Sequence, residues 1–167
     1  RMEVFLTRIL DKGIQINDLT VRIENPIGIG GMKLNRYLNK VIQGDCLEVM
    51  KRLPEKSIDM ILCDLPYGTT QNKWDSVIDL SKLWRQYERI IKDNGAIALT
   101  SQGLFTAKLI LSNEKLFKYK IIWIKSKSTN FLNAKIQPLR KHEDVCIFYK
   151  KQPTYHPQIL AGDPYDS

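Results

Sequence analysis

The chain has 167 residues, of which 43% are hydrophobic and 26% are charged, and its formal net charge is +8. This length suits one domain with its own core and is too short for two domains of ordinary size. The composition excludes a disordered chain, a collagen and a coiled coil, and it is typical of a soluble globular protein.

Three cysteines lie far apart in the sequence, with no Cys-x-x-Cys spacing and no histidine near them; they are Cys46, Cys63 and Cys146. This pattern offers no metal site and indicates buried thiols in a reducing compartment. The sequence has no apolar run of membrane-spanning length, and its first residues lack the pattern of a secretion signal. We therefore expect a cytoplasmic protein that does not enter a membrane.

The excess of positive charge is concentrated between Lys115 and Lys151. This stretch contains ten lysines and arginines and only two acids, Glu143 and Asp144, so its excess equals that of the whole chain. Such a segment attracts a polyanion through counterion release and long-range steering. A lysine-rich solvated surface explains the charge equally well.

The first part of the chain gives few structural signals. We expect residues 1–31 to be an N-terminal extension or linker ahead of a domain over residues 32–167. The glycines between Gly28 and Gly31 do not form a dinucleotide-binding fingerprint, because no strand precedes them and no helix with the third glycine follows. A short helix is expected over residues 32–39, leading into a strand over residues 41–43.

From residue 46 onward, helical and strand patterns alternate. The expected helices cover residues 46–53, 80–92 and 104–111, the expected strands 58–63, 96–100, 119–124 and 145–149, and the long loops 64–75 and 125–141. Asn94-Gly95 is expected to close the second helix. This order predicts an α/β fold, namely a Rossmann-like, mostly parallel sheet with helices on both faces.

Polar residues follow several of the expected strands. They are Asp45, Asp64 to Gly68, Ser101-Gln102 and Lys125 to Ser128. In open α/β sheets the ligand lies beyond the carboxyl ends of the strands, so we expect these residues to share one cleft. Trp123, which precedes Lys125, is expected to fill the core.

The segment Asp64-Leu65-Pro66-Tyr67 follows a buried strand directly. It resembles the signature of the DNA amino-methyltransferases, which methylate N6 of adenine or N4 of cytosine: an acidic or amide residue, two prolines and an aromatic residue. Leu65 stands where the first proline usually lies. The resemblance extends upstream to Gly44-Asp45-Cys46-Leu47 and Leu53-Pro54, and it covers roughly residues 40–157.

The resemblance implies a reaction on an exocyclic amine of DNA, most readily N6 of adenine, with S-adenosylmethionine as the cofactor. The lone pair of such an amine is delocalised into the ring, which makes it a poor nucleophile. The Asp64 carboxylate and the Leu65 carbonyl would accept its hydrogens, and Pro66 would stiffen the turn. Tyr67 would stack on a base that has been flipped out of the duplex.

The same resemblance assigns binding residues. Asp45 would accept from the adenine amine of S-adenosylmethionine, the backbone at Cys46 would meet its ring, and Asp64 would border it. A cap on the following helix also explains Asp45. Double-stranded DNA would be contacted by the loop after the signature and by the basic stretch; the residues are Lys73, Trp74, Lys125, Lys127, Lys135, Arg140 and Lys141.

One expected motif of this resemblance is missing. In the subclass whose catalytic motif comes first, a Phe-x-Gly-x-Gly loop near the C-terminus holds the methionine part of the cofactor, and the sequence does not contain it. We therefore expect a partial, truncated methyltransferase domain. Three explanations compete: part of a longer protein, a DNA-binding remnant without catalysis, or a chain completed by a second chain, as in a homodimer. N4-cytosine methylation is the alternative reaction.

Overall fold

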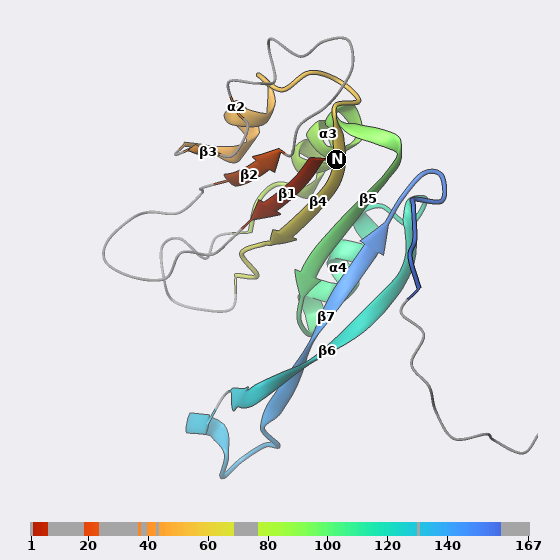
Figure 1. Ribbon diagram of the computed structural model, residues 1–167. Helices are drawn as coiled ribbons and strands as arrows, with labels where there is room; N and C mark the ends of the chain where they lie inside the picture. Colours follow the sequence, from red (N-terminus) through yellow and green to blue (C-terminus); the bar gives the residue numbers. More distant parts are fainter. Residues whose placement is uncertain are drawn as a thin grey trace, which may run out of the picture.

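The described strands form one β-sheet (Figure 1). The computed structural model describes residues 2–6, 19–23, 37, 40–42, 44–68, 77–129 and 131–157. Within these ranges seven strands form the sheet, in the spatial order β3-β2-β1-β4-β5-β7-β6. In chain order the strands are β1 (Met2–Leu6), β2 (Leu19–Ile23), β3 (Lys40–Ile42), β4 (Ile58–Asp64), β5 (Ile91–Ser101), β6 (Phe117–Thr129) and β7 (Arg140–Phe148).

Strand β4 occupies the middle of the sheet and runs parallel to both of its neighbours, β1 and β5. Ile58, Ile61 and Cys63 are all buried. An apolar strand that is covered by other elements is typical of the parallel core of an α/β protein. The chain leaves this core at Asp64, which is the last residue of β4 and is exposed.

The sheet is mixed, so the expectation of mostly parallel pairing is wrong for the described strands. Only β1 with β4 and β4 with β5 pair in parallel. The pairs β1 with β2, β2 with β3, β5 with β7 and β6 with β7 are antiparallel. The reason at the β6 end is connectivity: no crossover helix separates β6 from β7, and strands joined by a short connection pair as an antiparallel hairpin.

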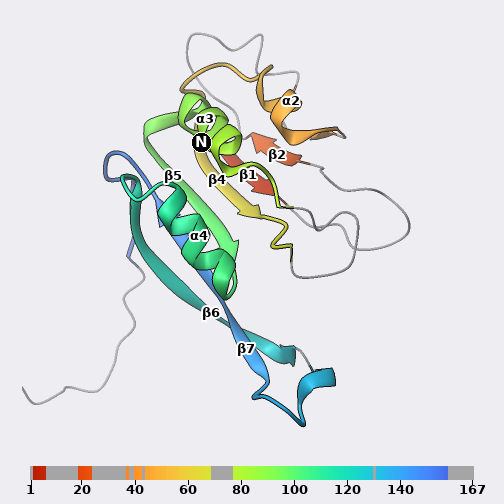
Figure 2. The ribbon, with the colours of Figure 1, turned by 180° about the vertical axis from the view of Figure 1, so that it is seen from behind.

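Helices α3 (Leu80–Ile90) and α4 (Leu104–Ser112) lie on the same face of the sheet (Figure 2). α3 connects β4 to β5, and α4 connects β5 to β6, which is parallel to β5 because β7 runs opposite to both. Successive right-handed crossovers toward one edge place their helices on one side. The helix layer that was expected on the second face is not found in the described ranges. None of the described helices is long and apolar enough to cross a membrane.

The core lies between these helices and strands β5 and β7. Leu99 on β5 and Leu109 on α4 are completely buried. Trp84 of α3 packs its ring 4.7 Å from the ring of Phe148, and its indole Nε1 donates a hydrogen bond of 2.7 Å to Ser112 on α4. Burial of each such side chain contributes about 1.5–3 kcal/mol.

Helix α3 ends at Ile90, and strand β5 begins directly after it at Ile91. Asn94 and Gly95 therefore lie inside β5 and do not close the helix as expected. The register between β4 and β5 shifts here. An ideal Cβ on Gly95 would lie 2.8 Å from the carbonyl oxygen of Asp59 and 2.7 Å from Cγ1 of Ile91. The close approach of the two strands thus requires glycine.

The segment expected to be a loop, residues 125–141, is strand at both of its ends. β6 continues to Thr129, and β7 begins at Arg140. The residues Lys125 to Thr129 are polar on both faces, so no apolar periodicity marks them, and pairing with β7 orders them. Trp123, expected in the core, is 51% exposed on this hairpin.

Near the N-terminus, β1 and β2 come from the segment expected to be an extension, and β1 lies between β2 and β4. The division of the chain at residue 31 stays a prediction. The expected helix over residues 32–39 falls outside the described residues except for Tyr37, and the glycines from Gly28 to Gly31 also fall outside them. Helix α2 (Cys46–Met50) is shorter than expected, and it packs against α3.

Replacing Gly95 by alanine should lower the free energy of unfolding by about 1–3 kcal/mol, because the methyl group forces β4 and β5 apart. Urea unfolding followed by circular dichroism measures the effect. Asn94→Ala, at the exposed neighbouring position, is the control and should be close to neutral. Equal stability of the Gly95 variant and the wild type would contradict this packing.

Candidate active site at the end of strand β4

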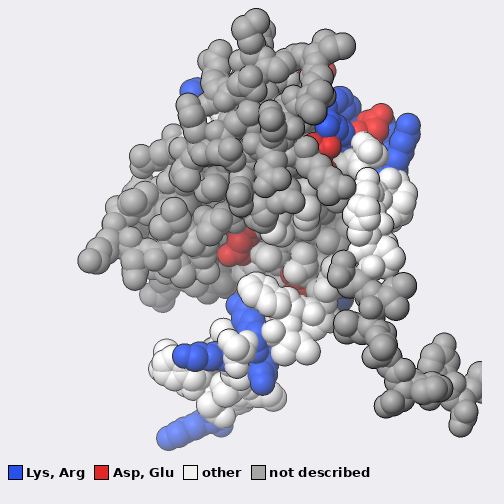
Figure 3. Space-filling model, in the orientation of Figure 1, with Lys and Arg blue, Asp and Glu red and all other residues white. Residues whose placement is uncertain are grey.

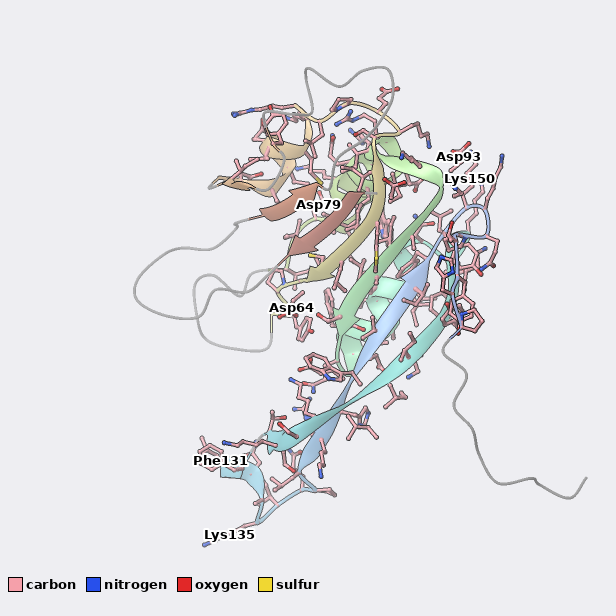
Figure 4. The ribbon with its side chains drawn as sticks, viewed as in Figure 1. Asp64, Asp79, Asp93, Phe131, Lys135 and Lys150 are labelled. Carbon is pink, nitrogen blue, oxygen red and sulfur yellow. The ribbon has the colours of Figure 1, made fainter. Side chains whose placement is uncertain are left out.

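Asp64 lies at the end of β4 (Figure 4), where two hydroxyl groups hold its carboxylate. Its Oδ1 accepts a 2.5 Å hydrogen bond from the hydroxyl of Thr100, its register partner on β5. The hydroxyl of Tyr67 lies 2.9 Å from the same Oδ1 and 2.7 Å from Thr100 Oγ1. No hydrogen bond to Oδ2 joins it to another described residue. Within the described part of the chain, one oxygen of the carboxylate is thus fixed and the other accepts no hydrogen bond.

The turn after Asp64 places Tyr67 over this carboxylate. Leu65 is 5% exposed and anchors the turn in the core, while Pro66 restricts its own φ angle. Gly68 has a φ of +68°, a backbone conformation that residues with a side chain rarely adopt. Tyr67 packs its ring 5.3 Å from the ring of Phe105 on α4.

The phenol of Tyr67 acts as a neutral donor in this cluster. Burial raises its pKa well above the usual range, the hydrogen bond with Thr100 acts in the opposite direction, and the negative charge of Asp64 raises it further. A neutral phenol can donate to the Asp64 carboxylate, whereas a phenolate would repel it. The raised pKa therefore keeps the cluster intact into the alkaline range.

Asp45 caps helix α2. Its Oδ1 accepts from the backbone N–H of Leu47 at 2.8 Å and of Glu48 at 3.2 Å. The alternative interpretation of Asp45 as a helix cap is therefore correct, and a role toward a cofactor stays a prediction that uses its second oxygen. β3, which precedes Asp45, runs in the same direction as β4 but is separated from it by β2 and β1.

Cys46 follows this cap and packs, half-buried, against the core. Burial raises the pKa of its thiol to about 11, and the negative charge of Asp45 contributes to the increase. The thiol is thus protonated and weakly nucleophilic at neutral pH.

The residues expected to share one cleft are only partly brought together. Ser101 is fully buried and its hydroxyl lies 3.0 Å from that of Thr106 on α4, so it is not part of a cleft. Gln102 lies at the end of β5, where its Oε1 accepts from Arg140 at 2.9 Å. Lys125 forms an ion pair with Glu143.

Thr100 is the residue that reasoning from the sequence missed. Its neighbours Leu99 and Ser101 are buried, and threonine in such a strand is common, so nothing local marks it. The signal is its register: Thr100, one residue before the end of β5, is the parallel partner of Asp64 at the end of β4.

The residues predicted to contact DNA divide into three groups. Lys127, Lys135 and Lys141 are exposed and have no ion pair with any other described residue. Lys125 and Arg140 are held by neighbouring side chains. Lys73 and Trp74 fall outside the described residues.

The raised pKa of Tyr67 predicts a pH-dependent stability. An unfolded chain ionises tyrosine near its ordinary pKa of about 10, whereas the folded protein keeps this proton. The contribution of Tyr67 to stability is therefore complete below about pH 10 and declines as the pH rises further, because only the unfolded state gains from ionisation. The wild type should lose stability relative to Tyr67→Phe in urea titrations above that pH, and a constant difference would contradict the assignment.

The thiol of Cys46 should react slowly with iodoacetamide, at a rate that still rises between about pH 9 and pH 11. Asp45→Asn keeps a helix cap but removes the charge, so the rate at pH 9 should increase. Glu48→Gln, which removes a neighbouring exposed charge, is the control. Peptide-resolved mass spectrometry measures the alkylation, and a wild-type rate that levels off near the ordinary thiol pKa would show the assignment to be wrong.

Two curated proteins are similar to part of the chain. The type II methyltransferase M.HinfI of Haemophilus influenzae is 27% identical over a match that covers 60% of this chain and 37% of that protein. The DNA adenine methyltransferase YhdJ of Escherichia coli (strain K12) is 27% identical over 75% of this chain and 47% of that protein. The chain thus spans less than half the length of these curated relatives. No model of a known protein family matches it.

Two solved structures share its fold. M1.HpyAVI in complex with SAM aligns with a TM-score of 0.53 and 17% identity, over 73% of this chain and 61% of that chain. The cytosine-N4-specific PvuII DNA methyltransferase aligns with a TM-score of 0.51 and 14% identity, over 66% of this chain and 49% of that chain. These alignments confirm the expected Rossmann-like α/β class. The chain therefore has a fold found in DNA methyltransferases and is similar in sequence to two of them.

Proposed function

We propose that this chain supplies the reacting corner of an S-adenosylmethionine-dependent DNA methyltransferase that acts on the exocyclic amine of a flipped base, N6 of adenine. The observation that carries the proposal is the exposed carboxylate of Asp64, held at the end of β4 by Thr100 and Tyr67. The sequence similarity of the chain to M.HinfI and YhdJ supports the assignment.

The carboxylate of Asp64 has the properties that activation of an amine requires. An aromatic amine becomes more nucleophilic when hydrogen-bond acceptors hold its two hydrogens, because the lone pair is then localised on the nitrogen. Oδ2 of Asp64 accepts one hydrogen, and the backbone carbonyl of Leu65 accepts the other. Because Oδ1 is already fixed by Thr100 and Tyr67, the acceptor needs no reorganisation during the reaction, and preorganised acceptors of this kind contribute strongly to catalysis.

Tyr67 positions the base. Its ring is supported by Phe105, and its hydroxyl donates to Asp64, so neither end of the side chain is free. A base rotated out of the duplex stacks on this ring with its amine directed toward Asp64. The fixed ring thus reduces the motion of the amine relative to its acceptors.

The residues near α2 fit S-adenosylmethionine. When bound, S-adenosylmethionine supplies a methyl group that is attached to a positively charged sulfonium. Asp45 is exposed, and its cap to α2 uses Oδ1, which leaves Oδ2 to accept from the adenine amine of the cofactor. The neutral thiol of Cys46 suits this location because a thiolate would compete for the methyl group.

Asp64 favours adenine over cytosine as the target. By resemblance, cytosine enzymes more often have serine at this position, and YhdJ is named as an adenine methyltransferase. The fold likeness to the cytosine-N4-specific PvuII enzyme keeps N4 of cytosine as the second candidate.

Asp64→Asn should lower the rate of methyl transfer from labelled S-adenosylmethionine to duplex DNA by about 10²–10³-fold. Asparagine keeps the shape and the bond from Thr100 but provides a weaker acceptor. Asp79→Asn, at the exposed cap of α3, is the matched control and should retain activity, since asparagine caps a helix equally well. Nucleoside analysis of the product should show N6-methyladenine.

Three results would change the proposal. N4-methylcytosine in the product would select the second candidate. Methyl transfer that survives Asp64→Asn would remove Asp64 from the chemistry. Duplex binding without any Asp64-dependent transfer would identify a DNA-binding protein without catalysis.

A further inference from the structure

A two-stranded arm extends beyond the body of the sheet (Figure 1). We define it as residues 125–142, which comprise the end of β6, the short 3-10 helix η1 (Phe131–Asn133) and the start of β7. Apart from Lys125 and Asn133, every side chain described in this arm is exposed. It therefore adds little to the core and presents its residues to a partner.

The tip of the arm has three exposed apolar side chains beside Lys135. Phe131 is 74% exposed, Leu132 84% and Ile136 81%. Phe131 lies at the far end of the arm and points away from the sheet (Figure 4). Clustered apolar side chains of this size on a projecting tip indicate a contact surface.

The charge of the arm selects the partner. Residues 125–142 contain five lysines and arginines and no acid. Basic side chains are prominent on the arm in the space-filling view (Figure 3). Lys127, Lys135 and Lys141 have no ion pair with another described residue, so their charge is available to a polyanion.

The base of the arm is joined to the candidate active site. Arg140 donates to Gln102, and the backbone oxygen of His142 lies 3.4 Å from Gln102 Nε2. Gln102 follows β5, the strand that supplies Thr100 to Asp64. The arm therefore starts at the strand end where the base would react, and this connection favours DNA over a membrane surface.

The length of the arm sets where it meets the duplex. Asp144 on β7 is the register partner of Ser101. Arg140 lies four positions before Asp144, which is about 13 Å at ~3.3 Å per residue. The rise of the duplex is about 3.4 Å per base pair, so an arm that lies along the duplex axis would span about four base pairs before its tip begins.

We propose that this arm enters the major groove of duplex DNA on one side of the reacting base, an inference that rests on the proposed function. The major groove admits a two-stranded ribbon. Lys127, Lys135 and Lys141 contact phosphates, and the apolar tip contacts base edges such as thymine methyl groups.

Two variants separate these contacts. Lys127→Ala/Lys135→Ala/Lys141→Ala should weaken binding to a mixed-sequence duplex of about 30 base pairs and reduce the slope of log affinity against log salt by about 0.9 per lost phosphate contact. Phe131→Ala/Leu132→Ala should weaken binding by roughly tenfold without changing the slope, because apolar contacts release no counterions. Fluorescence anisotropy over a salt series measures both, and circular dichroism confirms folding.

Matched controls lie outside the arm. Lys108→Ala/Lys115→Ala/Lys118→Ala removes the same number of exposed lysines, and Leu111→Ala removes an apolar side chain that is 67% exposed. The DNA affinity of both control variants should be closer to that of the wild type than the affinity of the arm variants is. A parallel titration uses vesicles of phosphatidylcholine and phosphatidylserine.

The outcomes distinguish this inference from the proposed function. Arm variants that bind DNA no worse than their controls, or that lose binding to anionic vesicles and not to DNA, overturn the arm assignment even if Asp64-dependent methyl transfer is found. Loss of DNA affinity with the two predicted salt signatures supports the arm, even if no methyl transfer is found. A tip variant that changes the salt slope would contradict the base contact.

Discussion

The hydrogen bonds that Thr100 and Tyr67 make to Oδ1 of Asp64 are the interaction on which the site depends. A carboxylate on the last residue of a strand is otherwise free to rotate into water. Here β4 supplies the carboxylate, β5 supplies one hydroxyl and the turn after β4 supplies the other. The cluster therefore exists only when the β4 and β5 register is correct and Leu65 is anchored in the core. Burial raises the pKa of the Tyr67 phenol, which preserves the geometry into the alkaline range.

The order of the strands explains why the arm and the site lie at the same edge. β5 and β6 are parallel, and the crossover through α4 leaves one strand position open between them. β7 fills that position and must run in the opposite direction, so its first residues lie beside the ends of β5 and β6. Any extension of this hairpin projects from the edge where Asp64 and Gln102 lie. The placement of the arm is thus a consequence of sheet topology.

Reasoning from the sequence succeeded where the signal is local. The buried run before Asp64 predicted β4, and the apolar pattern after Gly103 predicted α4 almost to the residue. It failed where pairing between distant segments decides the structure. Gly95 looks like a helix terminator, but its role comes from the carbonyl of Asp59 on another strand. Residues 125–129 look like a loop because they have no apolar face, and only β7 orders them. Thr100 was missed because its importance comes from the register with Asp64.

Asp45 and Asp64 show why a structural role and a functional role need not exclude each other. In each carboxylate, Oδ1 accepts two hydrogen bonds from the protein: backbone N–H groups of α2 for Asp45, and two hydroxyls for Asp64. An exposed carboxylate that lacked these donors would lose side-chain entropy whenever it bound a ligand. Because that ordering has already occurred during folding, the second oxygen can accept a hydrogen bond at a smaller entropic cost. The helix cap of Asp45 is therefore compatible with the proposed cofactor binding, because it orders the carboxylate as Thr100 and Tyr67 order that of Asp64.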